Sequence, residues 1–307
     1  MNKSAHSSVA RITLALACLG LFATSTAHTQ DWPSWRGRAQ NGVSELTNLV
    51  STWSTDGENL IWFQEYTARS TPAVFDGRVC ANGRTGEGVG KKEIVTCWNA
   101  ENGGKVWEHT FSILNTTVPF NRVGWGNVTG DSDTGYLYAV NVDGHLHCFD
   151  REGNIVWSWR LAEDLGRASG YGGRTSTPIV DEDRLILSVI GSAWGSLGGP
   201  PRHRYVAFEK ATGRVRWTST PGSAPADMNT QSVPIIAVIN GQRLIIDGNA
   251  DGNIYALQAR TGAKIWEYHL SKRGINVSPV VNGTTVYVAH SEENLDVGTM
   301  GRVVALD

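Results

Sequence analysis

The sequence predicts an all-β fold, a β-propeller of four-stranded blades, and three observations carry that prediction. A short phrase ending in Trp recurs with a period near 50 residues, which is typical of propeller blades. A second phrase, in which Pro leads a short apolar run, precedes most copies of the first. No stretch of roughly 12 residues has the apolar periodicity that a helix requires. The 35 Gly and 12 Trp among 307 residues also suit a protein with many strands and tight turns.

The Trp phrase consists of a small residue, a polar residue two positions later, a Gly and then the Trp. Its copies end at Trp107, Trp157, Trp217 and Trp266, and Trp62 is a forerunner. Each copy predicts a strand, a tight turn and a second strand, because Gly supplies the backbone freedom of a short turn. A Trp ring carries a large apolar area, and its N–H needs a partner when buried. We therefore expect these four Trp rings to dock between neighbouring blades.

The Pro phrase predicts the first half of each blade. Pro is tolerated at the first residue of a strand, and Asp-Gly or Asn-Gly between apolar runs predicts a hairpin. The predicted blades cover 70–107, 123–157, 175–217 and 230–266, and a fifth begins at 276 and ends at 307 without its last strand. Two explanations stay open. The chain is part of a longer, seven- or eight-bladed propeller, or a strand around 60–63, in the N-terminal segment 28–69, closes a five-bladed ring.

The N-terminus has the three parts of a secretory signal peptide. Lys3 and Arg11 precede an apolar run over 12–23, and small residues end at Ala27. We expect a signal peptide over 1–27 and an exported, periplasmic or cell-envelope protein. Cys18 lies inside the apolar run, so lipidation there is an alternative. No later segment reaches the roughly 20 apolar residues of a spanning helix.

Charge and cysteine content limit the function classes. The formal net charge of −2 lacks the basic footprint of a nucleic-acid-binding protein. Cys80 and Cys97 lie on neighbouring predicted strands, so a disulfide between them is conceivable. Cys97 and Cys148 nevertheless occupy the position that Ala207 and Ala256 hold in other copies. That correspondence favours small buried side chains over a bond or a reactive thiol.

The Trp phrase of the repeat resembles that of a known family. The stretches 207–217 and 256–266 resemble the phrase Ala-x-Asp-x-x-Thr-Gly-Lys-x-x-Trp of the pyrroloquinoline-quinone (PQQ) type β-propellers. The opening 31–37, followed by Gly42-Val43-Ser44, resembles a bacterial exported subgroup of that family. The resemblance covers roughly 31–307. It implies a propeller, commonly eight-bladed, whose Trp rings dock between blades, and a monomer.

The resemblance implies two functions. One branch of the family holds PQQ and Ca²⁺ in quinoprotein dehydrogenases that oxidise alcohols or sugars, with an adjacent Cys pair, a Trp floor, and Glu, Asn and Asp around the metal. This chain has no adjacent cysteines, and no residue matches a cofactor or catalytic motif. The other branch resembles the propeller of outer-membrane-protein assembly, a scaffold that binds partner proteins. The missing Cys pair favours the non-catalytic scaffold, and the dehydrogenase is the alternative.

Two local features are candidate sites. The stretch 131–135, Asp-Ser-Asp-Thr-Gly, has the alternating oxygens of a calcium loop, but Asp and Gly also suit a hairpin turn, which we favour. A Gly/Pro-rich insertion over 191–201 is followed by two arginines. Because long loops on rigid scaffolds often carry binding sites, Trp194, Arg202 and Arg204 are the predicted partner or ligand contact.

Overall fold

A computed structural model describes residues 31–47, 49–113, 122–165, 176–191, 202–222 and 232–307. The predicted signal peptide over 1–27, Cys18 and Trp194 therefore lie outside the described residues. Within the described part, 19 strands form five antiparallel sheets, and the helices are short: η1 (Gly88–Gly90) and α1 (Leu161–Asp164). The all-β prediction is confirmed. No described helix has the length and apolar character to cross a bilayer.

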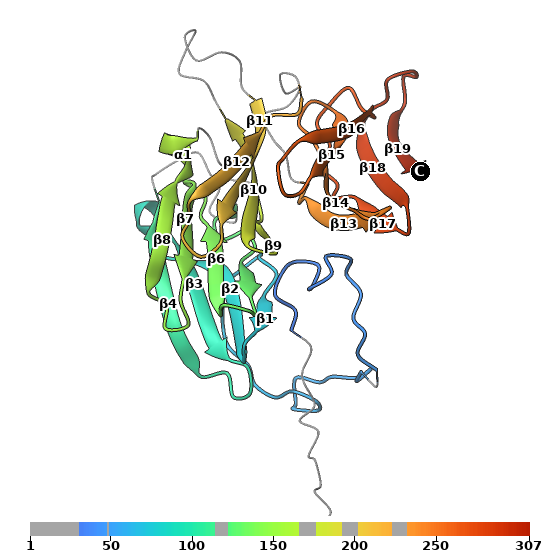
Figure 1. Cartoon of the computed structure of the whole chain (residues 1–307). Helices are drawn as coiled ribbons and strands as arrows, with labels where there is room; N and C mark the ends of the chain where they lie inside the picture. Colours follow the sequence, from blue (N-terminus) through green and yellow to red (C-terminus); the bar gives the residue numbers. More distant parts are fainter. Residues whose placement is uncertain (1–30, 48, 114–121, 166–175, 192–201, 223–231) are drawn as a thin grey trace, which may run out of the picture. The chain divides into compact units, whose positions relative to one another are not determined.

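The strands of each sheet follow one another in chain order (Figure 1). The first sheet contains β1 (Ala73–Phe75), β2 (Arg78–Thr85), β3 (Lys92–Asn99) and β4 (Lys105–Ser112), and the second contains β5 (Thr129–Asp131), β6 (Tyr136–Val140), β7 (His145–Phe149) and β8 (Ile155–Arg160). The third sheet contains β9 (Ile179–Asp181), β10 (Arg184–Gly191), β11 (Arg202–Glu209) and β12 (Val215–Ser219), and the fourth contains β13 (Ile235–Ile239), β14 (Gln242–Gly248), β15 (Asn253–Gln258) and β16 (Lys264–His269). The fifth sheet contains β17 (Val280–Asn282), β18 (Thr285–Glu293) and β19 (Met300–Leu306). Four sheets have four strands, and the fifth has three, as the repeat predicted.

The two sequence phrases mark the first strand of four sheets and the last strand of four sheets. Pro72, Pro178, Pro234 and Pro279 each come directly before the first strand of a sheet, where a missing N–H breaks no ladder bond. The Trp phrase spans the third and fourth strands. Its small residue is paired with its Trp in every complete sheet: Cys97 with Trp107, Cys148 with Trp157, Ala207 with Trp217, and Ala256 with Trp266. We call the fourth strand the Trp strand.

Each Trp ring before the last lies against the turn glycine of the following sheet. The ring of Trp62 lies at Gly103, Trp107 at Gly153, Trp157 at Gly213, and Trp217 at Gly262; a Cβ built on each glycine would come within 2.5–2.8 Å of a ring atom. The glycines have positive φ of 70–87°, so the turn needs glycine for its backbone as well as for this approach. None of the described glycine turns meets Trp266 in this way.

Apolar side chains between consecutive sheets form the core. Four clusters of buried residues join the first sheet to the second, the second to the third, the third to the fourth, and the fourth to the fifth. Ile186 and Tyr255, for example, share the cluster between the third and fourth sheets. Among the described residues, no such cluster joins the fifth sheet to the first. The core is therefore a series of interfaces between sheets rather than one centre.

A segment before the first sheet, residues 31–42, contacts every sheet, and we call it the N-terminal strap. Its bonds run from Trp32 N to Val74 O (2.7 Å), from Gly130 N to Pro33 O (2.7 Å), from Arg36 Nη1 to Pro279 O (2.6 Å) and from Ile236 N to Gln40 Oε1 (2.8 Å). Trp35 packs on the cluster that contains Ile179 of the third sheet. The strap thus ties together the first strands of five sheets that are far apart in sequence.

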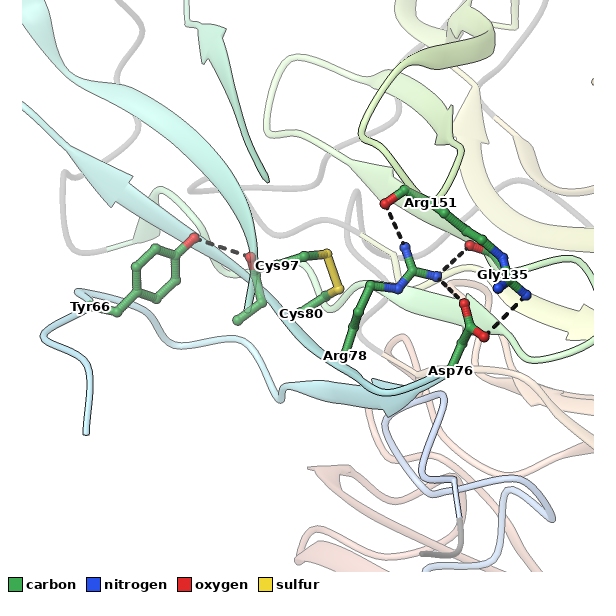
Figure 2. The surroundings of a disulfide bond; sticks show 8 residues. Tyr66, Asp76, Arg78, Cys80, Cys97, Gly135 and Arg151 are labelled. Atoms are coloured by element: carbon green, nitrogen blue, oxygen red, sulfur yellow. Dashed lines mark hydrogen bonds and ion pairs between the residues drawn. A yellow bond between two sulfur atoms is a disulfide. The ribbon is translucent and has the colours of Figure 1, made fainter. Parts of the chain in front are cut away.

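Cys80 and Cys97 form a disulfide, so the prediction of two small packed side chains is wrong for this pair. The two residues are directly paired on β2 and β3, with Cα atoms 4.1 Å apart (Figure 2). The residues that pair with the small position elsewhere are large: Ile186 opposite Ala207, and Ile246 opposite Ala256. Only the first sheet has Cys at both positions, and this combination was the available signal. Cys148 is a buried free cysteine.

Candidate functional site

The predicted partner contact is only partly within the described residues. Arg202 and Arg204 begin β11, where they pair with Gly191 and Val189 of β10. Both side chains are half-buried, and as alternate residues of one strand they lie on the same face of the sheet. Trp194 lies outside the described part of the chain. The structure therefore places the two arginines on one face of the third sheet. That Trp194 joins them in one contact surface stays a prediction.

The calcium-like stretch is the turn between β5 and β6. The amide of Gly135 bonds to Asp131 O (2.8 Å), and Thr134 donates to Asp131 Oδ2. The Lys210 ammonium lies 2.8 Å from Asp131 Oδ2 and 3.6 Å from Asp133 Oδ2. The carboxylates thus already face a cation supplied by the chain. The described residues contain no group of three or more His, Cys, Asp or Glu arranged to hold a metal ion.

A cavity of about 250 Å³ lies between the strap, the first strands of the second and third sheets (β5 and β9) and Arg243 of β14. Its lining is polar and comprises Pro33, Ser34, Arg38, Gln40, Thr129, Gly130, Asp131, Ser132, Asp133, Val180, Glu182 and Arg243. Its charges are paired within the protein: Arg243 with Asp181 and Glu182, and Arg38 with Asp31. The cavity is thus lined by hydrogen-bonding groups and by charged side chains that form ion pairs within the protein.

The described residues do not fit the site of a quinoprotein dehydrogenase. No aromatic ring lines the cavity, and two of its carboxylates are next to cations: Asp131 lies 2.8 Å from Lys210, and Glu182 lies 3.9 Å from Arg243. The third, Asp133, is largely exposed. The disulfide joins residues 17 positions apart, on neighbouring strands, and not an adjacent pair. The cavity thus has no ring floor, and the described residues offer no cluster of three metal-binding side chains. We derive no chemistry from PQQ or Ca²⁺ in this chain.

A buried Ser–His contact lies between the third and fourth sheets. His203 Nε2 is 2.5 Å from Ser188 Oγ, and His203 Nδ1 accepts from the amide of Ala250 at 3.2 Å. Because Nδ1 is the acceptor, the neutral ring carries its proton on Nε2 and donates it to Ser188. Burial lowers the pKa of His203 to about 4, so the ring stays neutral. His203 therefore cannot remove the Ser188 proton, and the pair is structural.

Asp247 is a second buried polar group in the same interface. It accepts hydrogen bonds from Tyr205 Oη (2.9 Å) and from Ser232 Oγ. Asp247 is only 1% exposed to solvent. This burial raises its pKa to about 7 despite the two hydrogen-bond donors. Glu93, buried between the first and second sheets, has a pKa raised to about 7 for the same reason.

We expect Asp247 to make stability depend on pH. Its folded-state pKa lies above its ordinary value near 4, so the folded protein binds more protons than the unfolded protein between about pH 4 and 7. Stability therefore falls as pH rises through this window. In Asp247→Asn this contribution disappears, and its urea midpoint should change less with pH than that of the wild type. Parallel midpoints for the two proteins from pH 4 to 7 would contradict the assignment.

The chain is similar to several solved structures. A search of curated protein sequences finds no match. Three solved structures are similar: quinohemoprotein alcohol dehydrogenase ADHIIG from Pseudomonas putida HK5 (16% identity, TM-score 0.47), a europium-containing methanol dehydrogenase (12%, 0.46) and BamB from Moraxella catarrhalis (16%, 0.35). The matches cover 80%, 90% and 80% of this chain, and 39%, 73% and 73% of those proteins, respectively. The chain thus spans well under half of the first structure.

The sequence also matches a family profile. Residues 91–307, which include the last two strands of the first sheet and all of the other four sheets, match the profile described as outer membrane protein assembly factor BamB, of PQQ-type repeats. The match covers more than half of the chain and includes every copy of the Trp phrase. This protein therefore belongs to the BamB-like family of PQQ β-propeller repeats.

Proposed function

We propose that the protein is an exported, non-catalytic scaffold that binds partner proteins in the cell envelope. The observation that carries the proposal is the family match over 91–307, whose description names an assembly factor. The disulfide supports an extracytoplasmic location, because disulfides persist in oxidising compartments. The buried, neutral His203 and the paired carboxylates around the cavity also suit a protein without a reaction centre in its described part.

The partner surface in this proposal is the end of the third sheet where Trp194, Arg202 and Arg204 lie in sequence. Arginine can bind a carboxylate through two parallel hydrogen bonds, and an aromatic ring beside it supplies apolar contact area. Such a surface suits an acidic segment of another envelope protein. The partner would be bound by surface side chains of the third sheet, and its binding would require no change in the packing of the core.

Site-specific photo-crosslinking tests the scaffold function. A photoreactive amino acid replaces Arg202 in one variant and Trp194 in a second. Lys105, an exposed residue of β4, serves as the matched control position. We expect both test positions, and not the control, to form a covalent adduct with one and the same envelope protein, identified by mass spectrometry. Adducts at all three positions, or at none, would contradict the proposed surface.

A cofactor experiment separates the scaffold from the dehydrogenase alternative. The purified protein is incubated with PQQ and Ca²⁺, passed over a desalting column, and its absorbance is recorded. We expect no retained quinone band and no dye reduction with alcohols or sugars, because the described residues lack a ring floor and free metal ligands. A retained band together with substrate-dependent dye reduction would overturn the scaffold proposal.

A further inference from the structure

Trp125, in the segment that leads into the second sheet, has two arginines beside its ring. The Cζ atom of Arg69 is 5.6 Å from the centroid of this ring, and the Cζ atom of Arg122 is 5.8 Å from it. Both distances are within the roughly 6 Å at which a guanidinium is attracted to the face of an indole. Trp125 and Arg122 are half-buried, and Arg69 is exposed. Residues from the segments before the first and second sheets thus meet around one ring.

A third arginine, Arg84 of β2, lies diagonally across from Arg69. Ala68 is bridged to Gly83 in antiparallel pairing, and each arginine is the next residue in its own strand. Two long side chains in this relation lie on one face and can reach each other. Burial and the charge of Arg69 both lower the pKa of Arg84, as expected for two cations that are close together. We call Arg69, Arg84 and Arg122 the arginine cluster.

Within its described part, the chain supplies no carboxylate to two members of the arginine cluster. Neither Arg69 nor Arg122 forms an ion pair there, whereas most of the other described arginines do, among them Arg78 and Arg243. The sequence 114–121, directly before Arg122, contains neither Asp nor Glu. Like charges that are held together destabilise the compact state unless an anion offsets them. This arrangement indicates a site for an anion from outside the chain.

The main chain on both sides of the indole is fixed by buried polar side chains of the first sheet. Glu93, 1% exposed, accepts hydrogen bonds from the amide of Gly124 (2.8 Å) and from that of Val142 (2.7 Å). Asn82, 2% exposed, donates to Gly126 O (3.1 Å). Both oxygens of the Glu93 carboxylate thus bind main-chain amides. A ring on a loop held in this way is already ordered before a ligand binds, which lowers the entropic cost of binding.

The composition of the arginine cluster favours a phosphate group over a single carboxylate. A guanidinium binds phosphate or carboxylate oxygens through two parallel hydrogen bonds, and its contact with a ring face uses none of these bonds. A phosphate monoester carries about −1.5 to −2 charges near pH 7 and has three acceptor oxygens, so it can bind several guanidinium groups at once. A carboxylate has one charge and two oxygens. The planar side chain of Arg also suits this recognition better than the point charge of Lys.

We propose that Arg69, Arg84 and Arg122 form a binding site for a phosphate monoester group, beside the ring of Trp125. The ring supplies an apolar surface for the part of the ligand that carries the phosphate. A soluble phosphate compound and the head group of an anionic lipid both have this chemistry. The site consists of residues in and before the first two sheets, so it is independent of the partner surface proposed on the third sheet.

Isothermal titration calorimetry with inorganic phosphate tests the site. The test variant is Arg69→Gln with Arg122→Gln, and the matched control, Arg160→Gln with Arg214→Gln, removes the same charge at two exposed arginines. We expect the control to bind phosphate with the Kd of the wild type. The test variant should bind roughly tenfold more weakly, because it loses hydrogen bonds to a charged group, and Arg84→Gln should weaken binding in the same direction. Equal Kd values in the test and control variants, at unchanged urea midpoints, would overturn the proposal.

A flotation experiment on the wild type identifies the source of the phosphate group and needs no variant to fold. The protein is mixed with vesicles of phosphatidylcholine that contain phosphatidic acid, whose head group is a phosphate monoester, or with vesicles of phosphatidylcholine alone. Flotation with the first vesicles only, reversed by inorganic phosphate, would support the site and assign a lipid. Calorimetric binding of phosphate without flotation would support the site and assign a soluble compound. Flotation that phosphate does not reverse, or binding to neither probe, would refute the proposal.

Discussion

Replacing Trp217 by Ala should lower the free energy of unfolding by about 3–5 kcal/mol, the usual effect of removing a large aromatic side chain from a core. The ring packs on the cluster between the third and fourth sheets and lies against the turn at Gly262. Its loss leaves a cavity at an interface between sheets, and the glycine turn cannot fill it. Urea unfolding followed by circular dichroism measures the change.

Trp266→Ala is the matched control for Trp217→Ala. Trp266 packs on the cluster between the fourth and fifth sheets, but it borders an open groove and no described glycine turn lies against it. We therefore expect a smaller loss, about 1–2 kcal/mol, which corresponds to partial burial of an apolar side chain. Equal losses in the two variants would show that the glycine turn contributes nothing to the docking of the ring.

Removing the Cys80–Cys97 disulfide should destabilise the protein by about 3 kcal/mol, the value for a closed loop of roughly 15 residues. The bond joins residues 17 apart, and it restricts the unfolded chain around the turn between β2 and β3. The measurement compares the wild type with the double variant Cys80→Ala, Cys97→Ala by urea unfolding without reductant.

A second double variant separates the bond from its packing. Cys80→Ile with Cys97→Ala reproduces the Ile–Ala pairs of the third and fourth sheets, Ile186 with Ala207 and Ile246 with Ala256. It restores apolar volume without a cross-link. If the bond itself stabilises the protein, the free energy of unfolding of this variant should be well below that of the oxidised wild type. It should be similar to that of the reduced wild type. Full recovery of stability by the Ile–Ala variant would assign the effect to packing.

The repeat explains why so much of the fold could be predicted. Each prediction about a blade rested on residues close together in sequence: a Pro before a strand, a glycine turn, a Trp two strands later. Such features depend on local backbone geometry and on pairing within one hairpin, so they are visible without the rest of the chain. The hairpin predicted for the copy that ends at Trp217, for example, is formed by β11 and β12.

The candidate sites were harder to predict, because they depend on side chains from different sheets. Asp131 and Asp133 suggested a calcium loop until Lys210, about 80 residues later in the chain, proved to lie between them. His203 and Ser188 are a structural pair only because Ala250 of the next sheet donates to the ring. No local pattern contains these partners.

The sequence by itself determined the repeat unit, its strands and the tight turn that precedes the Trp of each phrase. Those features follow from periodicity and turn chemistry, which act over a few residues. Only the tertiary structure decided that Cys80 and Cys97 bond, that the strap binds five sheets, and that the ring of Trp62 lies against the turn of the first sheet. These outcomes depend on which surfaces meet when the sheets pack. The separation of two residues along the sequence does not predict whether they are close in space.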